Sequence, residues 1–289
     1  MDSEFTSVSV KPLSGNLGAE IGDVDLSGEL STSQFSEIRD AFHKYSVIFF
    51  RNQHLEPEAH LRFAQRWGDI NINRFFTPVE GHPMIAEVRK EPDHEHNIGS
   101  VWHTDHSYDK APALGSVLSA RIVPEFGGDT LFSSMYMAYD ALSPGLKKAL
   151  EGLKAVHSSR HVFGAMQNSE RKLTGRTGNP ELAKQDNSHP IVITHPGSGR
   201  RALYVNPQFT THIDGWTAEE SAPLLNYLYQ HGTNPHFTAR LSWQEGMVTM
   251  WDNRATWHCA LNDYQGQRRL LHRITIEGVP LNESAIVFD

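Results

Sequence analysis

Four side chains that can bind a metal stand within seven residues of the stretch WHTDHSYDK, where His103 and Asp105 flank a threonine. In a strand, residues two apart point to the same face. His103 and Asp105 would then offer one nitrogen and one oxygen to a shared ion. Two ligands hold a metal weakly, so a third ligand is expected from another part of the chain. Without it, a histidine and an aspartate in this pattern are more often a polar surface pair than a metal site.

A candidate third ligand is His258, which stands near the far end of the chain in the stretch WDNRATWH. That position suits a neighbouring strand of a closed sheet. Two histidines and one carboxylate leave open positions on the metal and are diagnostic of non-haem Fe(II) oxygenases. Zinc accepts the same ligand types, so the ligands alone leave the metal undecided.

Two arginines follow in the apolar segment RRLLHRITI. Arg269 and Arg273 are an even number of residues apart, so in a strand they share a face. Arg269 suits a bidentate clamp on a carboxylate. A 2-oxoglutarate oxygenase needs such a clamp for the distal carboxylate of its co-substrate, whereas a zinc hydrolase does not. The plainer alternative for Arg269 is a structural ion pair.

The elements that carry these residues are mostly short strands with helices beside them. After Met84, apolar or alternating runs are separated by Gly, Pro and Asn, which favours a mostly β chain built as a β-sandwich or jelly roll. Those runs are MIAEVRK, LGSVLSARIV, PIVITH, ALYVN, MVTMWD and RRLLHRITIEG.

Helix signals occur at four places, as capping residues, prolines and terminal glycines. The first expected helix starts with a capping box from Ser31 to Gln34 and precedes a buried strand, Val47–Phe50. The second is framed by Pro57 and Gly68, and the third covers 134–153 with an interruption at Pro144. The fourth runs from the N-cap Thr217 to Gly232.

One polar, glycine-containing segment, residues 165–188, shows little periodicity, and a segment of this kind is typical of a lid or mobile loop. We find no internal repeat and no domain boundary. Residues 1–289 are therefore predicted to form a single domain, with 165–188 as a candidate lid.

Composition excludes several classes of protein. The net charge of −8 disfavours nucleic acid as a partner. The first residues show no secretory signal, and no apolar run reaches the roughly 20 residues of a membrane span. A single cysteine, Cys259, fits a cytoplasmic protein without an intramolecular disulfide. The tryptophans and tyrosines are compatible with a homodimer or homotetramer, but no pattern selects either.

Three ordered motifs resemble the taurine / 2,4-dichlorophenoxyacetate dioxygenase family of Fe(II)/2-oxoglutarate oxygenases: WHTD, GGDTLFSSMYMAYDALS, and WDNRATWH followed by DYQGQRRLLHRITI. The resemblance covers nearly the whole chain and implies a cupin-like jelly roll, the double-stranded β-helix. It also implies the roles of particular residues. These are His103, Asp105 and His258 as iron ligands, Thr130 and Arg269 on the distal carboxylate of 2-oxoglutarate, and Arg273, His106 and Phe209 at the substrate.

The chain departs from the taurine enzymes at three positions. They carry a histidine and, three residues later, a tyrosine after the second helix, where this chain has Asn73 and Phe76. Gly99 replaces an asparagine four residues before the first metal ligand. A buried ammonium without polar partners is costly, so these changes argue against taurine and favour an anion with a larger or more apolar body. The segments HVFGAM and THPGSGRRALYVN are closer to the alkylsulfate and phenoxyalkanoate branches.

The implied reaction is hydroxylation of a carbon next to a heteroatom in an alkylsulfate, sulfonate or aryloxyalkanoate. It consumes 2-oxoglutarate and O2, releases succinate and CO2, and leads to C–O or C–S cleavage. The alternatives are a hydroxylase of another carboxylate with a stable product, a zinc hydrolase on the same barrel, and a non-catalytic sensor of small anions.

Some residues also have a purely structural interpretation. Thr130 would be an ordinary strand residue, Phe209 and Cys259 core residues, and Arg273 the partner of an internal carboxylate. Surface or core positions are expected for His157, His161, His195 and His212.

Overall fold

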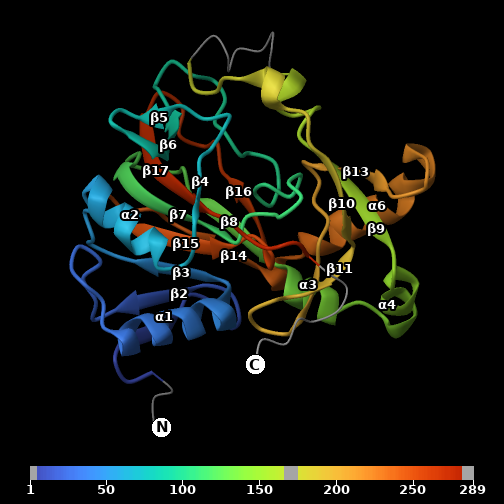
Figure 1. The fold of residues 1–289 in the computed structure, drawn as a ribbon, viewed down its shortest axis with the longest axis horizontal. Coiled ribbons are helices and arrows are strands. Elements are labelled where there is room, and N and C mark those ends of the chain that lie inside the picture. The colour runs from blue at the N-terminus through green and yellow to red at the C-terminus, as the bar shows by residue number, and fades with distance from the viewer. Residues whose placement is uncertain (1–4, 166–174, 282–289) are drawn as a thin grey trace.

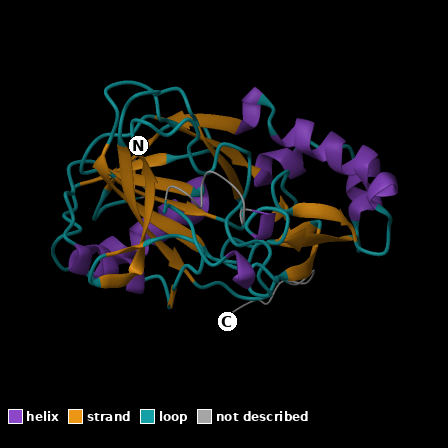
Figure 2. Cartoon of the chain, turned by 90° about the horizontal axis from the view of Figure 1, so that it is seen from above, coloured by secondary structure: helices purple, strands orange, loops and turns teal. Residues whose placement is uncertain are grey.

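The computed structural model describes residues 5–165 and 175–281 (Figure 1). Strands run through the body of the molecule, and the longer helices lie toward its edges (Figure 2). The mostly β prediction with flanking helices is confirmed. Of the predicted lid 165–188, residues 166–174 lie outside the described chain.

The largest sheet of the described chain has nine strands, and all pairings in it are antiparallel except that of β2 with β3. In spatial order the strands are β1 (Ser9–Pro12), β2 (Ala19–Gly22), β3 (Val47–Phe50), β15 (Val248–Asp252), β7 (Gly115–Ile122), β17 (Arg269–Ile276), β6 (His82–Lys90) and β5 (Pro78–Val79), with β4 (Ile70–Asn71) also paired to β17.

A second layer faces this sheet and completes the jelly roll. It consists of β14 (Thr238–Leu241), β8 (Thr130–Ser134) and β16 (Thr256–Ala260), in that spatial order. The two layers bury a common apolar core, in which Phe49 and Leu118 of the large sheet lie in one cluster with Phe132 of the second layer. The site residues of β8, β16 and β17 therefore come from strands of two facing sheets.

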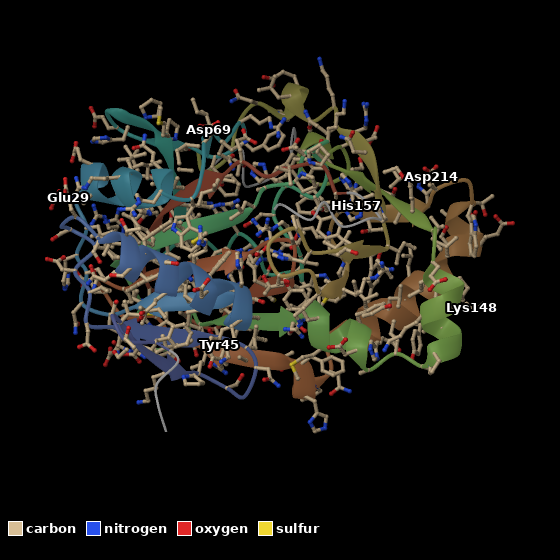
Figure 3. All side chains as sticks on the ribbon, turned by 60° about the horizontal axis from the view of Figure 1, so that its bottom comes forward. Glu29, Tyr45, Asp69, Lys148, His157 and Asp214 are labelled. Carbon is tan, nitrogen blue, oxygen red and sulfur yellow. The ribbon has the colours of Figure 1, made fainter. Side chains whose placement is uncertain are left out.

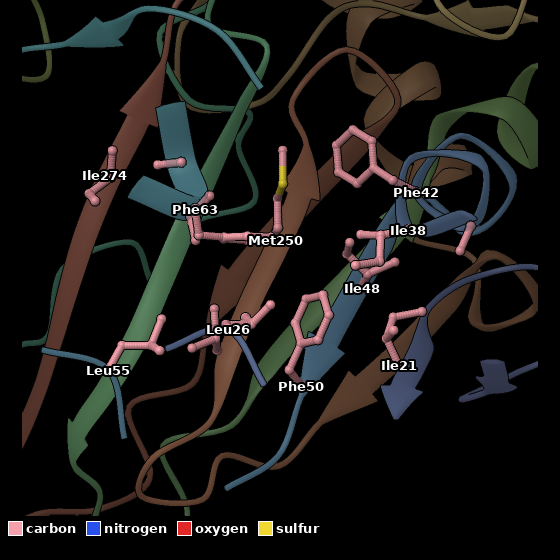
Figure 4. Close-up of a cluster of buried hydrophobic side chains, with 14 of the residues drawn as sticks. Ile21, Leu26, Ile38, Phe42, Ile48, Phe50, Leu55, Phe63, Met250 and Ile274 are labelled. Carbon is pink, nitrogen blue, oxygen red and sulfur yellow. The ribbon is translucent and has the colours of Figure 1, made fainter. Parts of the chain in front are cut away.

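The outer face of the large sheet is covered by two helices, α1 (Thr32–Tyr45) and α2 (Pro57–Gln65). Figure 4 shows Phe42 of α1 and Phe63 of α2 beside Ile48 and Phe50 of β3. Alternate residues of a strand point to opposite faces, so β3 gives Val47 and Phe49 to the inner core and Ile48 and Phe50 to the outer one. This is why the whole VIFF run is buried.

Most of the remaining elements contribute to a third apolar cluster around Trp257, the second residue of β16. The helices here are α3 (Met135–Asp140), α4 (Pro144–Leu150) and α6 (Ala218–Gly232), with short 3-10 turns at η2 (Pro180–Leu182) and η3 (Pro235–Phe237). The strands are β10 (Asp186–Pro190), β9 (Lys154–Ser158) and β13 (Thr210–Ile213) in one sheet, and β11 (Val192–Thr194) and β12 (Arg201–Leu203) in another.

The predicted helix boundaries are confirmed where side chains cap the backbone. Ser31 and Gln34 form both hydrogen bonds of a capping box at α1, and Thr217 with Glu220 does the same at α6. The helix expected over 134–153 is divided into α3 and α4, with Pro144 as the first residue of α4. Within the described part of 165–188, η2 and the start of β10 are regular structure that the weak periodicity did not predict.

No helix in residues 5–165 and 175–281 is long and apolar enough to cross a membrane. Charged residues such as Glu29 and Lys148 are exposed at the edges of the molecule, whereas His157 lies inside it and is fully buried (Figure 3).

Candidate metal centre

His103, Asp105 and His258 converge on one buried point between the two layers. His103 Nε2 lies 3.7 Å from Asp105 Oδ1, and His258 Nε2 lies 3.7 Å from Asp105 Oδ2. The three ligand atoms all lie within 4.8 Å of one another. These separations exceed a hydrogen bond and suit three ligands around one cation.

The backbone brings these ligands together differently from the expected strand. His103 forms a single bridge with His258 of β16, through His103 N to His258 O at 3.0 Å and the reciprocal bond at 2.8 Å. The prediction that His103 and Asp105 share a regular strand is wrong. After the bridge, the Thr104 hydroxyl lies 2.7 Å from the carbonyl oxygen of Asn253 and 2.6 Å from that of Thr256, so both are within hydrogen-bonding distance of its one hydrogen. A turn then begins at Asp105, and His106 has a φ of 55°.

Hydrogen bonding prepares the ligand atoms for a metal. His103 Nδ1 lies 2.7 Å from the Val101 carbonyl, so it donates there and leaves the Nε2 lone pair free. Burial lowers the pKa of both histidines, so both are neutral and able to bind a cation. Burial would raise the pKa of Asp105, but nearby positive charge, that of Arg273 first, outweighs burial and holds this pKa below its ordinary value, so the carboxylate is ionised.

Arg273 and Ser116 fix the Asp105 carboxylate. Ser116 Oγ donates to Asp105 Oδ2 at 2.9 Å. Arg273 Nη2 lies 3.2 Å from the same oxygen without the angle of a good hydrogen bond, so its contact is mainly electrostatic. Since this contact leaves Arg273 Nη2 and Nε without hydrogen-bond acceptors in the described chain, the guanidinium can also receive an anion from the pocket.

Arg269 is only 4 % exposed, yet it makes no ion pair with any described residue, and its Nε is buried without a hydrogen-bond partner there. Its guanidinium lies 5.5 Å from the centre of the Trp243 ring. Burial lowers its pKa, and the electrostatic effects of Tyr264 and Asp129 offset this only in part. A buried cation of this kind is costly unless an anion binds beside it. The structural ion pair considered from the sequence is thus absent from the described chain.

One pocket contains the triad, both arginines and a largely apolar wall. Its lining includes Phe76, Val88, Ile98, Tyr108, Leu118, Phe163, Phe209, Trp251 and Leu271, together with Gly99, Thr130 and His106. Gly99 has a φ of 83°, and a Cβ there would lie 3.2 Å from His103 Cε1, so glycine gives the His103 ring its space. Of the site residues predicted from the sequence, Asn73 alone is not part of this wall. It lies behind His106 instead, with its Nδ2 3.3 Å from His106 Nε2.

Comparison with known proteins matches residues 9–275 to the family described as taurine catabolism dioxygenase TauD, TfdA family. The chain belongs to this family. It is therefore a 2-oxoglutarate-dependent dioxygenase that uses Fe(II) and O2, with the jelly roll that the sequence predicted. These comparisons favour the dioxygenase over the zinc hydrolase and the non-catalytic sensor considered from the sequence.

Several relatives of the dioxygenase have been named by activity. An alkylsulfatase of Acinetobacter baylyi is 36% identical over 94% of this chain and 85% of its own length. An alpha-ketoglutarate-dependent sulfate ester dioxygenase of Pseudomonas putida is 32% identical, covering 94% and 90%. A 2,4-dichlorophenoxyacetate dioxygenase of Cupriavidus pinatubonensis is 32% identical, covering 93% and 97%. Among solved structures, a taurine dioxygenase from Burkholderia xenovorans has a TM-score of 0.80 and 35% identity over 94% of this chain and 92% of its own.

The sequence did not reveal the buried network that supports the metal-binding turn of the dioxygenase. Asp252 receives Arg254 Nε at 2.8 Å and Nη2 at 2.7 Å, and lies 2.8 Å from His195 Nε2. The next residue, Asn253, accepts the Thr104 hydroxyl described above. The motif WDNRATWH contains Asp252, Asn253 and Arg254 together with His258. It is the only feature of the sequence that could have indicated that these residues lie near the site.

The other histidines are ordinary surface or core residues, as expected. His157 and His195 are buried, and His161 and His212 are exposed or half-buried. No second group of three metal-binding side chains occurs in the described ranges. Cys259 is buried, and burial raises the pKa of its thiol to about 11, so it is an unreactive core residue.

Proposed function

We propose that this dioxygenase hydroxylates a small organic monoanion with an apolar body, and that a primary sulfate ester is the best fit. The observation that supports this most is the pair of buried arginines on one face of β17, both of which line the pocket of the triad. Arg269 is free of ion pairs in the described chain. Arg273 contacts Asp105 but keeps Nε and Nη2 without hydrogen-bond acceptors there.

His103, Asp105 and His258 would hold Fe(II), since they offer two neutral imidazole nitrogens and one ionised carboxylate. With 2-oxoglutarate and O2, the iron supplies the oxidising power to replace a C–H bond by C–OH, and succinate and CO2 are released. The residues themselves orient the reactants, and the apolar wall of the pocket excludes water.

Arg269 and Thr130 would bind the distal carboxylate of 2-oxoglutarate. Thr130 Oγ1 accepts a hydrogen bond from Trp243 Nε1 at 2.9 Å, so its own hydrogen remains available for donation. A planar guanidinium and a hydroxyl donor together match the oxygens of a carboxylate. This assignment also explains why the fold keeps a cation buried without an internal partner.

The charge of the pocket supports a monoanionic substrate. Asp105 is the only carboxylate among the described lining residues. Against it stand Arg269, Arg273 and a divalent metal, which leave three positive charges in excess. The 2-oxoglutarate dianion cancels two of them, so one remains for the substrate beside Arg273. A zwitterion such as taurine brings an ammonium for which the described wall offers no free carboxylate.

Hydroxylation at the carbon that bears the ester oxygen would lead to cleavage of a sulfate ester. The new hydroxyl loses its proton as C=O forms, and the C–O bond to sulfate breaks with its electron pair on the leaving oxygen. The products are an aldehyde and inorganic sulfate. An aryloxyalkanoate is the second candidate, because a 32% identical relative is named for such a substrate. A carboxylate hydroxylated to a stable product is the third.

A substrate panel tests the proposal. Succinate release from a medium-chain alkyl sulfate should show a kcat/KM about a hundredfold or more above that for taurine, because one unpaired buried charge is strongly rejected. The aryloxyalkanoate is expected between them. Arg273→Gln should raise the KM for alkyl sulfate while the KM for 2-oxoglutarate stays unchanged. A preference for taurine over every monoanion would contradict the proposal.

Cytoplasmic location, a homodimer or homotetramer, and a single dioxygenase domain over residues 1–289 also remain proposals. The single, buried cysteine supports the first. A lid over 165–188 remains a prediction as well. The described end of that segment reaches the pocket, because Thr177 forms an isolated bridge with Phe76 and both line it. Two hydrogen bonds flank this bridge: Thr77 Oγ1 donates to Gly175 O at 2.7 Å, and Gly178 N donates to Phe75 O at 2.8 Å.

A further inference from the structure

His106 occupies an unusual place beside the metal site. It directly follows the ligand Asp105, is buried, and has the positive φ that turns the chain. Its ring lies 5.5 Å from the ring of Tyr108, and both residues line the pocket. An imidazole here can serve a substrate as a hydrogen-bond donor, as an acceptor or as an apolar surface. The partners of its two nitrogens decide which.

Asn73 determines the state of one nitrogen. Its Oδ1 accepts two backbone hydrogen bonds, from Phe75 N at 2.9 Å and Phe76 N at 3.0 Å. These bonds fix the orientation of the amide, which is otherwise ambiguous. The amide group that faces His106 Nε2 at 3.3 Å is therefore the NH2 donor. Nε2 must accept this bond and so carries no hydrogen.

Asp109 determines the state of the other nitrogen. Its Oδ2 lies 3.1 Å from His106 Nδ1, and Arg74 Nη2 contacts the same oxygen. Burial would raise the pKa of Asp109, but the bond from His106 and the charge of Arg74 hold it below its ordinary value. An ionised carboxylate only accepts hydrogen bonds, so Nδ1 carries the hydrogen. The two contacts thus agree on one neutral tautomer.

We propose that Asn73 is a positioning residue which, together with Asp109, engages both nitrogens of His106 and leaves only ring carbon to face the substrate. Each imidazole nitrogen has one hydrogen-bonding position, so none remains for a ligand. His106 then acts as an apolar part of the wall, and Arg273 is the side chain that pairs with the substrate anion. The consequence for substrate selection rests on the function proposed above, whereas the tautomer does not.

The tautomer can be read directly by NMR. The full chain is labelled with 15N-histidine, loaded with Zn(II) and 2-oxoglutarate, and measured at one neutral pH, with His106→Gln used to assign the His106 signals. We expect Nδ1 to be protonated and Nε2 unprotonated. A hydrogen on Nε2 in the unmodified protein would overturn the proposal. Because no turnover is needed, the result is independent of the substrate.

Asn73→Asp tests whether Asn73 controls this state. The carboxylate keeps the shape and the acceptor for Phe75 N and Phe76 N, but it faces Nε2 with an acceptor in place of a donor. We therefore expect Nε2 to become protonated in this variant. Asn179→Asp is the matched control, because it makes the same change near Arg74 without contacting His106. An unprotonated Nε2 in Asn73→Asp, or the same shift in the control, would overturn the role of Asn73.

Asn73→Ala tests the effect on substrate. Without the amide, the His106 ring is free to rotate and to present a nitrogen to the pocket. We expect the KM for the alkyl sulfate to rise about tenfold, the usual effect of a disturbed pocket contact, while the KM for 2-oxoglutarate stays unchanged. An equal rise in both KM values would indicate general damage and would overturn the claim of positioning. Failure of every sulfate ester as a substrate of the unmodified enzyme would instead refute the proposed function and leave the NMR result standing.

Discussion

Replacing Arg269 by methionine is expected to raise the KM for 2-oxoglutarate by about two to three orders of magnitude. Removing one partner of a buried, hydrogen-bonded charge pair costs about 2–5 kcal/mol, and each 1.4 kcal/mol is tenfold in affinity. Methionine roughly fills the space, so the loss reflects the charge and the hydrogen bonds. The measurement is succinate release at varied 2-oxoglutarate with saturating Fe(II).

The same variant should not lose stability in the absence of 2-oxoglutarate. Arg269 is buried without an ion pair in the described chain, and an uncompensated cation opposes folding. We expect the Tm of the ligand-free variant to equal or exceed that of the unmodified enzyme. Arg268→Met is the control, because Arg268 is half-exposed and pairs with Glu91 at 3.1 Å. A clear drop in Tm for Arg269→Met, with no selective effect on 2-oxoglutarate, would assign this arginine to structure.

Asp252→Asn is expected to lower the free energy of unfolding by about 3–5 kcal/mol, because it leaves a buried guanidinium without its anion. Asp252 is 1 % exposed and receives both side-chain bonds of Arg254 as well as that of His195. Chemical denaturation at neutral pH measures the loss. Fe(II) affinity should fall as well, because Asn253 holds the turn that carries Asp105 through Thr104.

The stability difference between Asp252→Asn and the unmodified enzyme should depend on pH. Burial would raise the pKa of Asp252, but Arg254 and His195 hold it far below its ordinary value. A carboxylate with a lowered folded-state pKa stabilises the protein at pH values above its unfolded-state pKa of about 4. This stabilisation is lost as the pH falls from that value toward the folded-state pKa. The difference should be constant from neutral pH to about 5 and shrink in more acid solution. Asp140→Asn, at an exposed pair with Arg200, should show almost no effect.

The helices and several strands were predictable because their signals are local. The capping box at Ser31 depends only on a side chain three residues away, and the break at Pro144 follows from the missing amide of proline. The strand VIFF was recognisable because it is apolar on both faces. The pairing of β16 with β8, and the second layer it builds, depends on contacts between distant segments that no short pattern reports.

The site was predictable in its ligands but not in its supports. His103, Asp105 and His258 were predicted as ligands because two histidines and a carboxylate occur together with Arg269 and Arg273 in three ordered motifs, and the structure brings their ligand atoms within 4.8 Å of one another. The regular strand expected around His103 was wrong because a tertiary contact, from Thr104 to the carbonyl of Asn253, helps begin a turn there. The position of Asn73 behind His106 was equally hidden, since the two residues meet only in the folded chain.

The central claim is that His103, Asp105 and His258 hold Fe(II) with 2-oxoglutarate anchored on Arg269. Anaerobic titration of the purified enzyme with Fe(II) and 2-oxoglutarate, followed by visible absorption, tests it most directly. We predict a weak charge-transfer band that saturates in the unmodified enzyme, is absent in His103→Ala, and needs far more 2-oxoglutarate in Arg269→Met. Absence of the band in the unmodified enzyme, with Zn(II) bound tightly instead, would contradict the account.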